Sequence, residues 1–463
     1  MKVGLVGAVS LMAVACSGGP PHRTAPSTPP SGGPASSVAV APSADPAPTV
    51  DGDLTFGTVG AVPLLVKRVP ESELGTMQLY IRGGASERTA NNAGRDALSV
   101  RVAVTGGTAS LTKDAFDREL FRLGTEVGGT SLNAYSMFYA KALAAHMERS
   151  FELLAEVFLR PALPPREVER QRARLLTQLR ARLRSPEGEL NEGTRRLFYA
   201  GHPYENAASG TEETVSRFSR DDLVAHLAAR RSQSRLAVVV VGPVAYATVA
   251  GWVRRHFSSL PRGAYAPPAL PPVGHEAAAL AFTKADLPTH YLEASFVTPG
   301  WDEPDFPASI VALRVLGQRL FDEVRTKRSL SYAPTVRHVW SAAVTRGALY
   351  VTAVDVNTTV RVMLDEVAKL KRELVTESEL RGVQATFATS QLMANEATDG
   401  QADWIALVTL VGGDPRIRHQ LLDRVAGVTP EQVRTFAREH LVNLQTAVVG
   451  PTAPDPAVFK LVP

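Results

Sequence analysis

Apolar side chains recur with two different periods along the chain, and these periods predict both strands and helices. Residues 77–81 alternate apolar and polar side chains, as a strand with one buried face does. Apolar residues recur at steps of three and four in 98–104, 116–123 and 147–159, which predicts helices. Gly128-Gly129 favours a bulge or bend inside a strand. Further strands are expected at 62–66, 126–132, 134–142 and 237–241, and further helices from Pro165 through Arg182 and at 221–229.

The second half of the chain repeats the order of elements of the first half. Ser219–Asp222 and Thr429–Gln432 both read as capping boxes, in which the first and last residues satisfy each other's backbone N–H groups. Each opens a helix that leads to a short apolar strand, and a Gly-Pro pair closes each strand, at Gly242 and Gly450. The offset is about 210 residues, from Ser219 to Thr429. A series repeated in the same order predicts two homologous domains.

Length and composition agree with two domains. The 463 residues, of which 44% are hydrophobic and 21% charged, exceed what one core usually fills. We place the domains at 53–263 and 281–463, joined by a proline-rich connector at 264–280. The net charge of +4 is small, and the sequence has no block of Lys and Arg and no interleaving of aromatic and basic residues. We therefore expect no binding of nucleic acid.

Residues 1–16 read as the signal peptide of a bacterial lipoprotein. A lysine precedes the apolar run at 3–14, and small residues stand just before Cys16, which fits the acylated first residue of a mature lipoprotein. Cys16 is the only cysteine, so no intramolecular disulfide can form. The apolar run is too short for a permanent transmembrane helix. Ala13 stands where leucine is commoner, so an ordinary secretory signal with an incidental cysteine stays open.

Residues 17–52 are rich in Pro, Ser, Ala and Gly and contain almost no large aliphatic side chains. Such a stretch cannot bury enough apolar area to offset its ordering entropy, so we expect a disordered tether. Behind an acylated cysteine, the tether would hold the folded part off a membrane surface. The expected location is the bacterial cell envelope, lipid-anchored, on the periplasmic face of the outer membrane.

The segment from Leu320 to Tyr332 contains the candidate functional residues of the chain. Apolar positions at three- and four-residue steps predict a helix that runs to about Lys327, followed by a break at the serines. If Tyr332 opens the next strand, Arg325 and Tyr332 can point into the same space. A guanidinium and a phenol aimed at one spot would suit a carbonyl oxygen that becomes an oxyanion.

An alternative interpretation needs no chemistry. Asp322 and Arg325 are three residues apart on a helix and could pair at the surface, and Tyr332 could be an ordinary half-buried strand residue. Spacing alone does not separate the two interpretations.

Several segments together resemble the insulinase-like zinc peptidases, family M16. The strongest is Arg325–Tyr332, preceded by Leu320–Val324, which resembles the arginine/tyrosine segment in the C-terminal half of that family. The resemblance runs from about Leu54 to Pro451 and implies an α+β fold of two homologous domains, each a mixed, mostly antiparallel sheet covered by helices. Four weaker matches are Asn133-Ala134-Tyr135, Glu167–Arg170, His202-Pro203-Tyr204 and Gly210–Glu213.

The resemblance breaks down at the metal site. M16 peptidases bind zinc through a helix that carries His-x-x-Glu-His and through a glutamate on a later helix. The matching helix, Gly94–Ala103, holds no histidine, and Gln178 stands where the later glutamate would fall. Losing both imidazoles and both glutamates removes the metal and the general base together. We therefore expect no metal, no cofactor and no catalytic residue in this chain.

No other part of the sequence offers a replacement. His275-Glu276 begins like the zinc motif, but Ala279 takes the place of the second histidine, and no two of the ten histidines lie within five residues of each other. His146 stands alone near a helix start. The mature protein has no cysteine nucleophile, and the chain has no Gly-x-Ser-x-Gly motif.

A chain that keeps the arginine/tyrosine pair without the metal resembles one subunit of the two-chain M16 peptidases. In that branch one subunit carries the zinc motif and the other supplies the arginine and the tyrosine. The resemblance implies a zinc-binding M16 partner, a peptide substrate, and roles for Arg325 and Tyr332 in binding the substrate or oxyanion. The edge of the hairpin at 126–142 could accept a peptide as an added strand. The family's glycine-rich turn is reduced to Gly317-Gln318-Arg319, which puts the substrate contacts of that loop in doubt.

Two other functions stay open. The protein could be a lipoprotein that binds peptides or envelope proteins and has no part in proteolysis. It could also be a zinc metallopeptidase in its own right, which the empty metal helix disfavours.

Overall fold

The computed structural model describes residues 45–341 and 344–460. The predicted signal peptide at 1–16 and the predicted tether up to residue 44 lie outside the described residues. Within the described ranges, no helix combines the length and the apolar character that crossing a bilayer requires.

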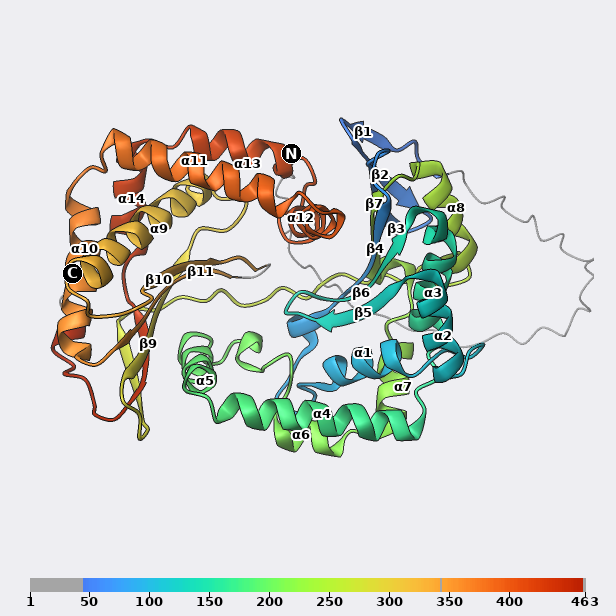
Figure 1. Cartoon of the computed structure of the whole chain (residues 1–463), viewed down its shortest axis with the longest axis horizontal. Coiled ribbons are helices and arrows are strands. Elements are labelled where there is room, and N and C mark those ends of the chain that lie inside the picture. The colour runs from blue at the N-terminus through green and yellow to red at the C-terminus, as the bar shows by residue number, and fades with distance from the viewer. Residues whose placement is uncertain (1–44, 342–343, 461–463) are drawn as a thin grey trace, which may run out of the picture. The chain divides into compact units, whose positions relative to one another are not determined.

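The first half of the fold is a seven-stranded mixed sheet (Figure 1). Strands β3 and β7 pair in parallel, and every other neighbouring pair is antiparallel. In sheet order the strands are β1 (Thr49–Asp51), β2 (Leu54–Val59), β3 (Val62–Arg68), β7 (Leu236–Gly242), β4 (Leu74–Arg82), β6 (Tyr135–Leu143) and β5 (Glu126–Ser131).

Several helices of the first half cover one face of this sheet. Phe151 and Phe158 of α3 and Trp252 of α8 join Val238 and Val240 of β7 in one apolar core. The helices are α1 (Arg95–Thr105), α2 (Lys113–Leu123), α3 (Met147–Leu159), α4 (Pro165–Leu183), α5 (Pro186–Phe198), α6 (Glu212–Arg217), α7 (Arg220–Ala228) and α8 (Tyr246–Phe257). The short 3₁₀ turns of this half are η1 (Gly84–Glu87), η2 (Ala144–His146), η3 (Pro203–Glu205) and η4 (Gln233–Arg235).

The second half repeats this arrangement. Its five strands lie in the order β8-β12-β9-β11-β10, with β8 and β12 parallel, which reproduces the order β3-β7-β4-β6-β5 of the first sheet. The strands are β8 (Ala279–Lys284), β9 (His290–Thr298), β10 (Thr335–Val339), β11 (Thr345–Ala353) and β12 (Gln445–Gly450). The helices are α9 (Phe306–Leu320), α10 (Val356–Arg372), α11 (Glu377–Ala394), α12 (Thr398–Leu410), α13 (Ile417–Ala426) and α14 (Pro430–His440), with a π-helical turn η5 (Phe321–Thr326) and a 3₁₀ turn η6 (Val458–Lys460). The expected α+β fold of two mixed sheets covered by helices is confirmed.

One helix of each half covers the sheet of the other half. Helix α12 packs on β4 and β7 of the first sheet, where Ile405 joins Val239 in a buried cluster. Helix α5 packs on β9 and β12 of the second sheet, where Leu190 contacts Ala447 and Val449. The two helices are both 13 residues long and occupy equivalent places in the repeat. This exchange buries the face of each sheet that its own helices leave uncovered.

Polar contacts fix α12 on the first sheet. Gln78 of β4 donates to the Asp403 carboxylate at 2.7 Å, and Thr76 shares a hydrogen bond of 2.9 Å with Thr398. The Lys141 ammonium on β6 binds the Asp399 carboxylate.

The capping boxes appear where the sequence places them. Ser219 and Asp222 cap α7, and Thr429 and Gln432 cap α14, each with both reciprocal hydrogen bonds. Helix α3 spans the same residues, 147–159, as the helix predicted from periodicity.

The predicted tether overruns the start of the fold. Residues 45–52 belong to the folded part, since β1 pairs with β2 and the Asp45 carboxylate accepts from the Gly60 backbone N–H at 2.7 Å. The Arg254 guanidinium binds the same carboxylate at 2.8 Å. Charged groups, rather than buried apolar side chains, hold this segment in place. The prediction of disorder rests on the lack of large aliphatic residues, so it does not take these charged contacts into account.

The glycine pair of β5 makes no bulge. Gly128 and Gly129 pair in unbroken register with Tyr139 and Phe138 of β6. Their role is close approach, because a Cβ on Gly129 would lie 2.6 Å from the Val100 side chain of α1. The glycines let α1 lie directly against the edge of the sheet.

Asp96 anchors α1 to the surrounding elements. Its carboxylate accepts hydrogen bonds from the hydroxyls of Ser131 on β5 and Ser136 on β6 and from Nε2 of His226 on α7, the last at 2.8 Å. Nδ1 of His226 accepts in turn from Arg230 at 3.0 Å, so the imidazole is neutral. One carboxylate therefore ties three elements to the first turn of α1.

The ionisation of Asp96 follows from these contacts. Burial alone would raise the pKa of Asp96, but the hydrogen bond from His226 and the charge of Arg230 outweigh it, and the pKa lies below its ordinary value of 3.8. Burial is also the main reason that the pKa of His226 lies below its usual value. The pair is therefore a carboxylate beside a neutral imidazole.

We predict that Asp96→Asn lowers the free energy of unfolding at pH 7 by about 3–5 kcal/mol, since a charged group is removed from a buried network and the new amide N–H₂ faces donors. Urea unfolding followed by circular dichroism measures the change. Asp221→Asn, whose side chain is 92% exposed on α7, is the control and should change the stability by less than about 0.5 kcal/mol.

The difference in stability between wild type and Asp96→Asn should also depend on pH. Because the folded-state pKa of Asp96 lies below 3.8, its stabilising contribution is present above that pH and is lost as the pH falls through the folded-state pKa. The stability difference between wild type and Asp96→Asn should hold from pH 7 to about pH 4 and shrink below it. Equal stability of the two proteins at pH 7 would contradict the anchoring role.

Candidate functional site

Arg325 and Tyr332 lie together at the end of α9. The guanidinium carbon of Arg325 stands 4.4 Å from the centre of the Tyr332 ring and 4.8 Å from the centre of the Phe321 ring. The guanidinium thus lies over two aromatic rings, which restricts where it can move. The structure brings together the two residues that the sequence singled out.

The backbone explains how the two side chains meet. The last turn before Lys327 is π-helical, and Ser329 adopts the left-handed conformation with φ 52°, which non-glycine residues rarely take. Leu330 N–H closes the turn on the Val324 carbonyl at 2.8 Å. The expectation that Tyr332 opens a strand is wrong, because β10 begins only at Thr335. The tyrosine instead lies on the loop between η5 and β10.

The surroundings of the pair differ from the alternative in which Asp322 and Arg325 form a surface ion pair and Tyr332 is a half-buried strand residue. Among the described residues no ion pair joins Asp322 to Arg325, and the acidic partner in this turn is Glu323, which binds Lys327 and Arg328. These two cations lower the pKa of Glu323 to about 2. Tyr332 is 78% exposed rather than half-buried in a strand. Its hydroxyl is therefore free to meet a ligand or another chain.

A separate cavity of about 510 Å³ lies beside α1 in the first half. Ala97 and Arg101 of α1 line it and are four residues apart, the spacing of the two histidines in His-x-x-Glu-His. The glutamate of that motif would then fall on Val100, which is buried against Gly129. Methyl, isopropyl and guanidinium groups stand where the motif has two imidazoles and a carboxylate, and none of them is a zinc ligand.

The later helix also lacks a carboxylate toward this cavity. Gln171, Leu175 and Arg182 of α4 line it. Gln178 falls on the same helical stripe by its spacing, but its side chain is exposed. Glu167, the nearest acidic residue on this helix face, lies one turn earlier and is held by Arg170 and Gln171 at 2.6 and 2.7 Å.

The weaker sequence matches converge around α1. The backbones of Gly94 and Gly210 touch, since a Cβ on either would approach the other's Cα within 2.8 Å. Arg88 is buried and donates to the Asn133 side chain at 3.2 Å and to the Asn206 carbonyl at 3.1 Å. Burial lowers the pKa of Arg88 to about 10. Segments far apart in the sequence are thus fastened to one region.

Sequence reasoning missed several residues of this region. Asp96 stands in the first turn of α1, where acidic residues are common because they complement the helix dipole, so its sequence position gives no sign of its buried partners. Arg101, Arg182 and Arg195 share the cavity but come from three helices, so their meeting left no pattern in the sequence.

One further group of side chains could approach a metal ion. Within the described ranges, Asp305, Glu439 and His440 hold ligand atoms within 4.8 Å of one another. They lie at the start of α9 and the end of α14, in the second half, and Glu439 is exposed. This group does not correspond to the zinc motif.

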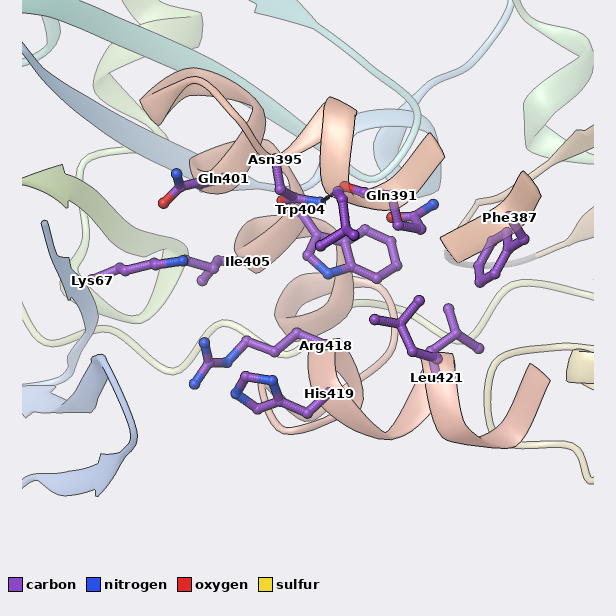
Figure 2. A pocket seen from close by; sticks show the side chains of 12 residues that line it. Lys67, Phe387, Gln391, Asn395, Gln401, Trp404, Ile405, Arg418, His419 and Leu421 are labelled. Atoms are coloured by element: carbon purple, nitrogen blue, oxygen red, sulfur yellow. Dashed lines mark hydrogen bonds between the residues drawn. The ribbon is translucent and has the colours of Figure 1, made fainter. Parts of the chain in front are cut away.

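A smaller cavity of about 180 Å³ lies among α11, α12, α13 and the end of β3 (Figure 2). Trp404 and Leu421 make part of its wall apolar. Its two cations are already paired, since Arg418 and Lys67 both bind the Asp53 carboxylate, at 2.9 and 3.0 Å. The cavity therefore marks a junction between the two halves of the fold.

Comparison with known protein families gives two adjoining matches. Residues 64–212 match the model described as "Insulinase (Peptidase family M16)", and residues 217–387 match "Peptidase M16 inactive domain".

Curated relatives include both peptidases and a subunit of a respiratory complex. An uncharacterized zinc protease of Mycobacterium leprae is 25% identical over 85% of this chain and 91% of its own length. Subunit 1 of the mitochondrial cytochrome b-c1 complex of Bos taurus is 24% identical, over 52% of this chain and 51% of its own length. The chain thus spans about half of the latter relative.

Solved structures share the fold. A peptidase M16 inactive domain from Pseudomonas fluorescens has a TM-score of 0.79 at 18% identity, covering 87% of this chain and 99% of that one. A protease from Helicobacter pylori has a TM-score of 0.77 at 17% identity, covering 84% and 97%. Because the two family matches together cover residues 64–212 and 217–387, the chain belongs to the M16 peptidase family.

Proposed function

We propose that this chain is a non-catalytic M16 subunit that supplies Arg325 and Tyr332 to the active site of a zinc-binding partner of the same family, so that the pair hydrolyses peptides. The observation that carries the proposal is the Arg325–Tyr332 pair, in which the guanidinium lies over the ring of an exposed tyrosine.

The chemistry of this pair fits a developing negative charge. A phenol O–H and a guanidinium N–H both donate hydrogen bonds, and the guanidinium keeps its charge at any physiological pH. Donors fixed in advance stabilise an oxyanion without reorganising during the reaction. The contact with two rings restricts Arg325 in this way.

The composition of the α1 cavity supports assigning the metal to a partner. Ala97, Val100 and Arg101 stand at the spacing of the zinc motif and offer no imidazole or carboxylate. Zinc supplies the activated water in such peptidases, so hydrolysis would need a chain that carries the motif.

The edge of the first sheet offers a place for the substrate. Strand β5 is the last strand of its sheet, and its residues Gly129, Thr130 and Ser131 line the 510 Å³ cavity. An extended peptide can add to such an edge through backbone hydrogen bonds. A second cavity, of about 840 Å³, lies beyond the β5–β6 turn and is lined by Asn133 and by Pro267 of the connector.

The proposal includes a lipid anchor at Cys16 and a place in the cell envelope, on the periplasmic face of the outer membrane. The support is the sequence alone, since the signal-like segment ends in the only cysteine of the chain.

We predict that the purified chain holds no stoichiometric zinc after dialysis, because the motif positions carry no ligand atoms. Elemental analysis measures the content, with a zinc-motif chain of the same family prepared in parallel as the control. A His440→Ala variant separates out any metal held by the Asp305, Glu439 and His440 group. A full equivalent of zinc in both the wild type and this variant would support a peptidase active by itself.

We predict that Cys16→Ser moves the protein from the membrane fraction to the soluble fraction, because acylation requires the thiol. Fractionation of cells followed by immunoblotting measures the distribution, and Ser17→Ala serves as the control. A Cys16→Ser protein that stays with the membrane would argue against the lipid anchor.

We predict that Tyr332→Phe lowers turnover by the reconstituted pair about 10²–10³-fold, or about 3–4 kcal/mol, since one oxyanion donor is lost with little change of shape. Arg325→Ala should act similarly, with some added loss of packing against Phe321. The assay is peptide hydrolysis by this chain mixed with a zinc-motif M16 chain of the same genome.

Size-exclusion chromatography shows whether each variant still assembles, and Lys327→Gln, which removes a cation from the same turn, is the matched control. Unchanged turnover in intact Tyr332→Phe and Arg325→Ala complexes would sink the proposed role. It would favour a lipoprotein that binds peptides or envelope proteins without taking part in hydrolysis.

A further inference from the structure

The cavity beside α1 is lined by cations and by no carboxylate. Arg101 of α1, Arg182 of α4 and Arg195 of α5 all line it, and the remaining lining residues are neutral. Three arginines from three helices therefore border one space of about 510 Å³, at the position where the zinc motif would lie.

The acidic groups around this cavity are already engaged. Glu192 is shared between Arg195 and Arg196, so it balances only one of them. Glu167 binds Arg170, and Asp96 is held by His226.

One of the three cations, Arg101, has donor capacity to spare. Within the described ranges its guanidinium makes no hydrogen bond or ion pair, whereas Arg195 binds Glu192 at 2.5 Å and its remaining unpaired Nε is buried. For Arg101, half-buried at the cavity wall, burial is the cause that lowers its pKa, with no neighbouring carboxylate to oppose it. A partly buried guanidinium without an acidic partner is stabilised by an anion, because hydrogen bonds to the anion replace those it has lost to water.

We propose that this cavity binds a carboxylate of a peptide that adds to strand β5, with Arg101 as the principal ligand and Arg182 and Arg195 beside it. The geometry points to a peptide because residues 129–131 of the edge strand β5 line the same cavity as the three arginines, so a chain paired with β5 would run beside that cavity. Guanidinium groups bind carboxylates with two parallel hydrogen bonds, which suits the flat anion.

The carboxylate could be the C-terminus of the peptide or the side chain of Asp or Glu, and the chemistry of recognition is the same. The proposal concerns the peptide of the proposed function but needs no partner chain, because the cavity is built from this chain alone.

Fluorescence anisotropy with three labelled hexapeptides of identical Ala and Thr core tests the proposal. The first has a free C-terminal carboxylate, the second a C-terminal amide, and the third an amide together with one internal Glu. The purified chain should bind the first or the third at least about tenfold more tightly than the second. Which of the two gains identifies the source of the carboxylate.

Arg101→Gln should abolish this preference, reducing the ratio of affinities to about one, while the neutral amide peptide binds as before. Arg182→Gln, at the exposed rim, should reduce the ratio less and is a second variant if Arg101→Gln folds poorly. Arg174→Gln removes the same charge from the exposed face of α4 and should leave the ratio unchanged. Thermal unfolding confirms that each variant is folded.

Equal affinity of the wild type for all three peptides, or an unchanged preference in folded Arg101→Gln and Arg182→Gln, would overturn the proposal. Tyr332→Phe serves to separate it from the proposed function, since that variant should keep the preference. If Tyr332→Phe abolishes hydrolysis but keeps the preference for the carboxylate peptide, both proposals stand. If the wild type shows the preference but Tyr332→Phe hydrolyses normally, only the proposed function fails, and if Tyr332→Phe lowers hydrolysis but the wild type shows no preference, only the carboxylate site fails.

Discussion

The reciprocal cover of the two sheets by α5 and α12 is the packing on which the rest of the structure depends. Strand β7 shows the reason, because Val238 and Val240 face the helices of their own half while Val239 faces α12 of the other half. A strand that is apolar on both sides needs cover on both sides. Each half therefore completes the core of the other, and neither sheet would bury its second face without the exchanged helix.

This packing leaves α1 at the edge of the first sheet, where polar contacts hold it. Gly129 allows the close approach to Val100, and Asp96 ties the first turn to β5, β6 and α7. In this position α1 borders the cavity with Ala97, Arg101, Val104 and Thr105.

The arginine/tyrosine segment depends on backbone geometry at the end of α9. A π-helical turn and the left-handed Ser329 return the chain toward the helix, which places the Tyr332 ring on the Arg325 guanidinium. Tyr332 is exposed and Arg325 half-buried, and the neighbouring cations Lys327 and Arg328 pair with Glu323. The two chemically distinctive regions, one in each half, are therefore of different kinds: a cationic cavity beside an edge strand, and a presented pair of donors.

By itself, the sequence determined those features that rest on local pattern. Periodicity located α3 to the residue, and the capping boxes marked the starts of α7 and α14. Local hydrogen bonding and side-chain period set these features, and both can be read from neighbouring residues. The sequence predicts that Arg325 and Tyr332 meet only if Tyr332 opens a strand, and the structure brings them together by a different backbone path.

Only the tertiary structure decided which elements meet across the chain. Leu190 reads as an ordinary apolar helix position, and nothing near it in the sequence shows that its partner is Val449 of the other half. Likewise Arg101, Arg182 and Arg195 lie on three separate helices, each with its own unremarkable charge pattern, and become one site only because α1, α4 and α5 pack around the same space. Such meetings depend on the free energy of the whole fold, which burial of both faces of both sheets determines, and no local stretch of sequence contains that information.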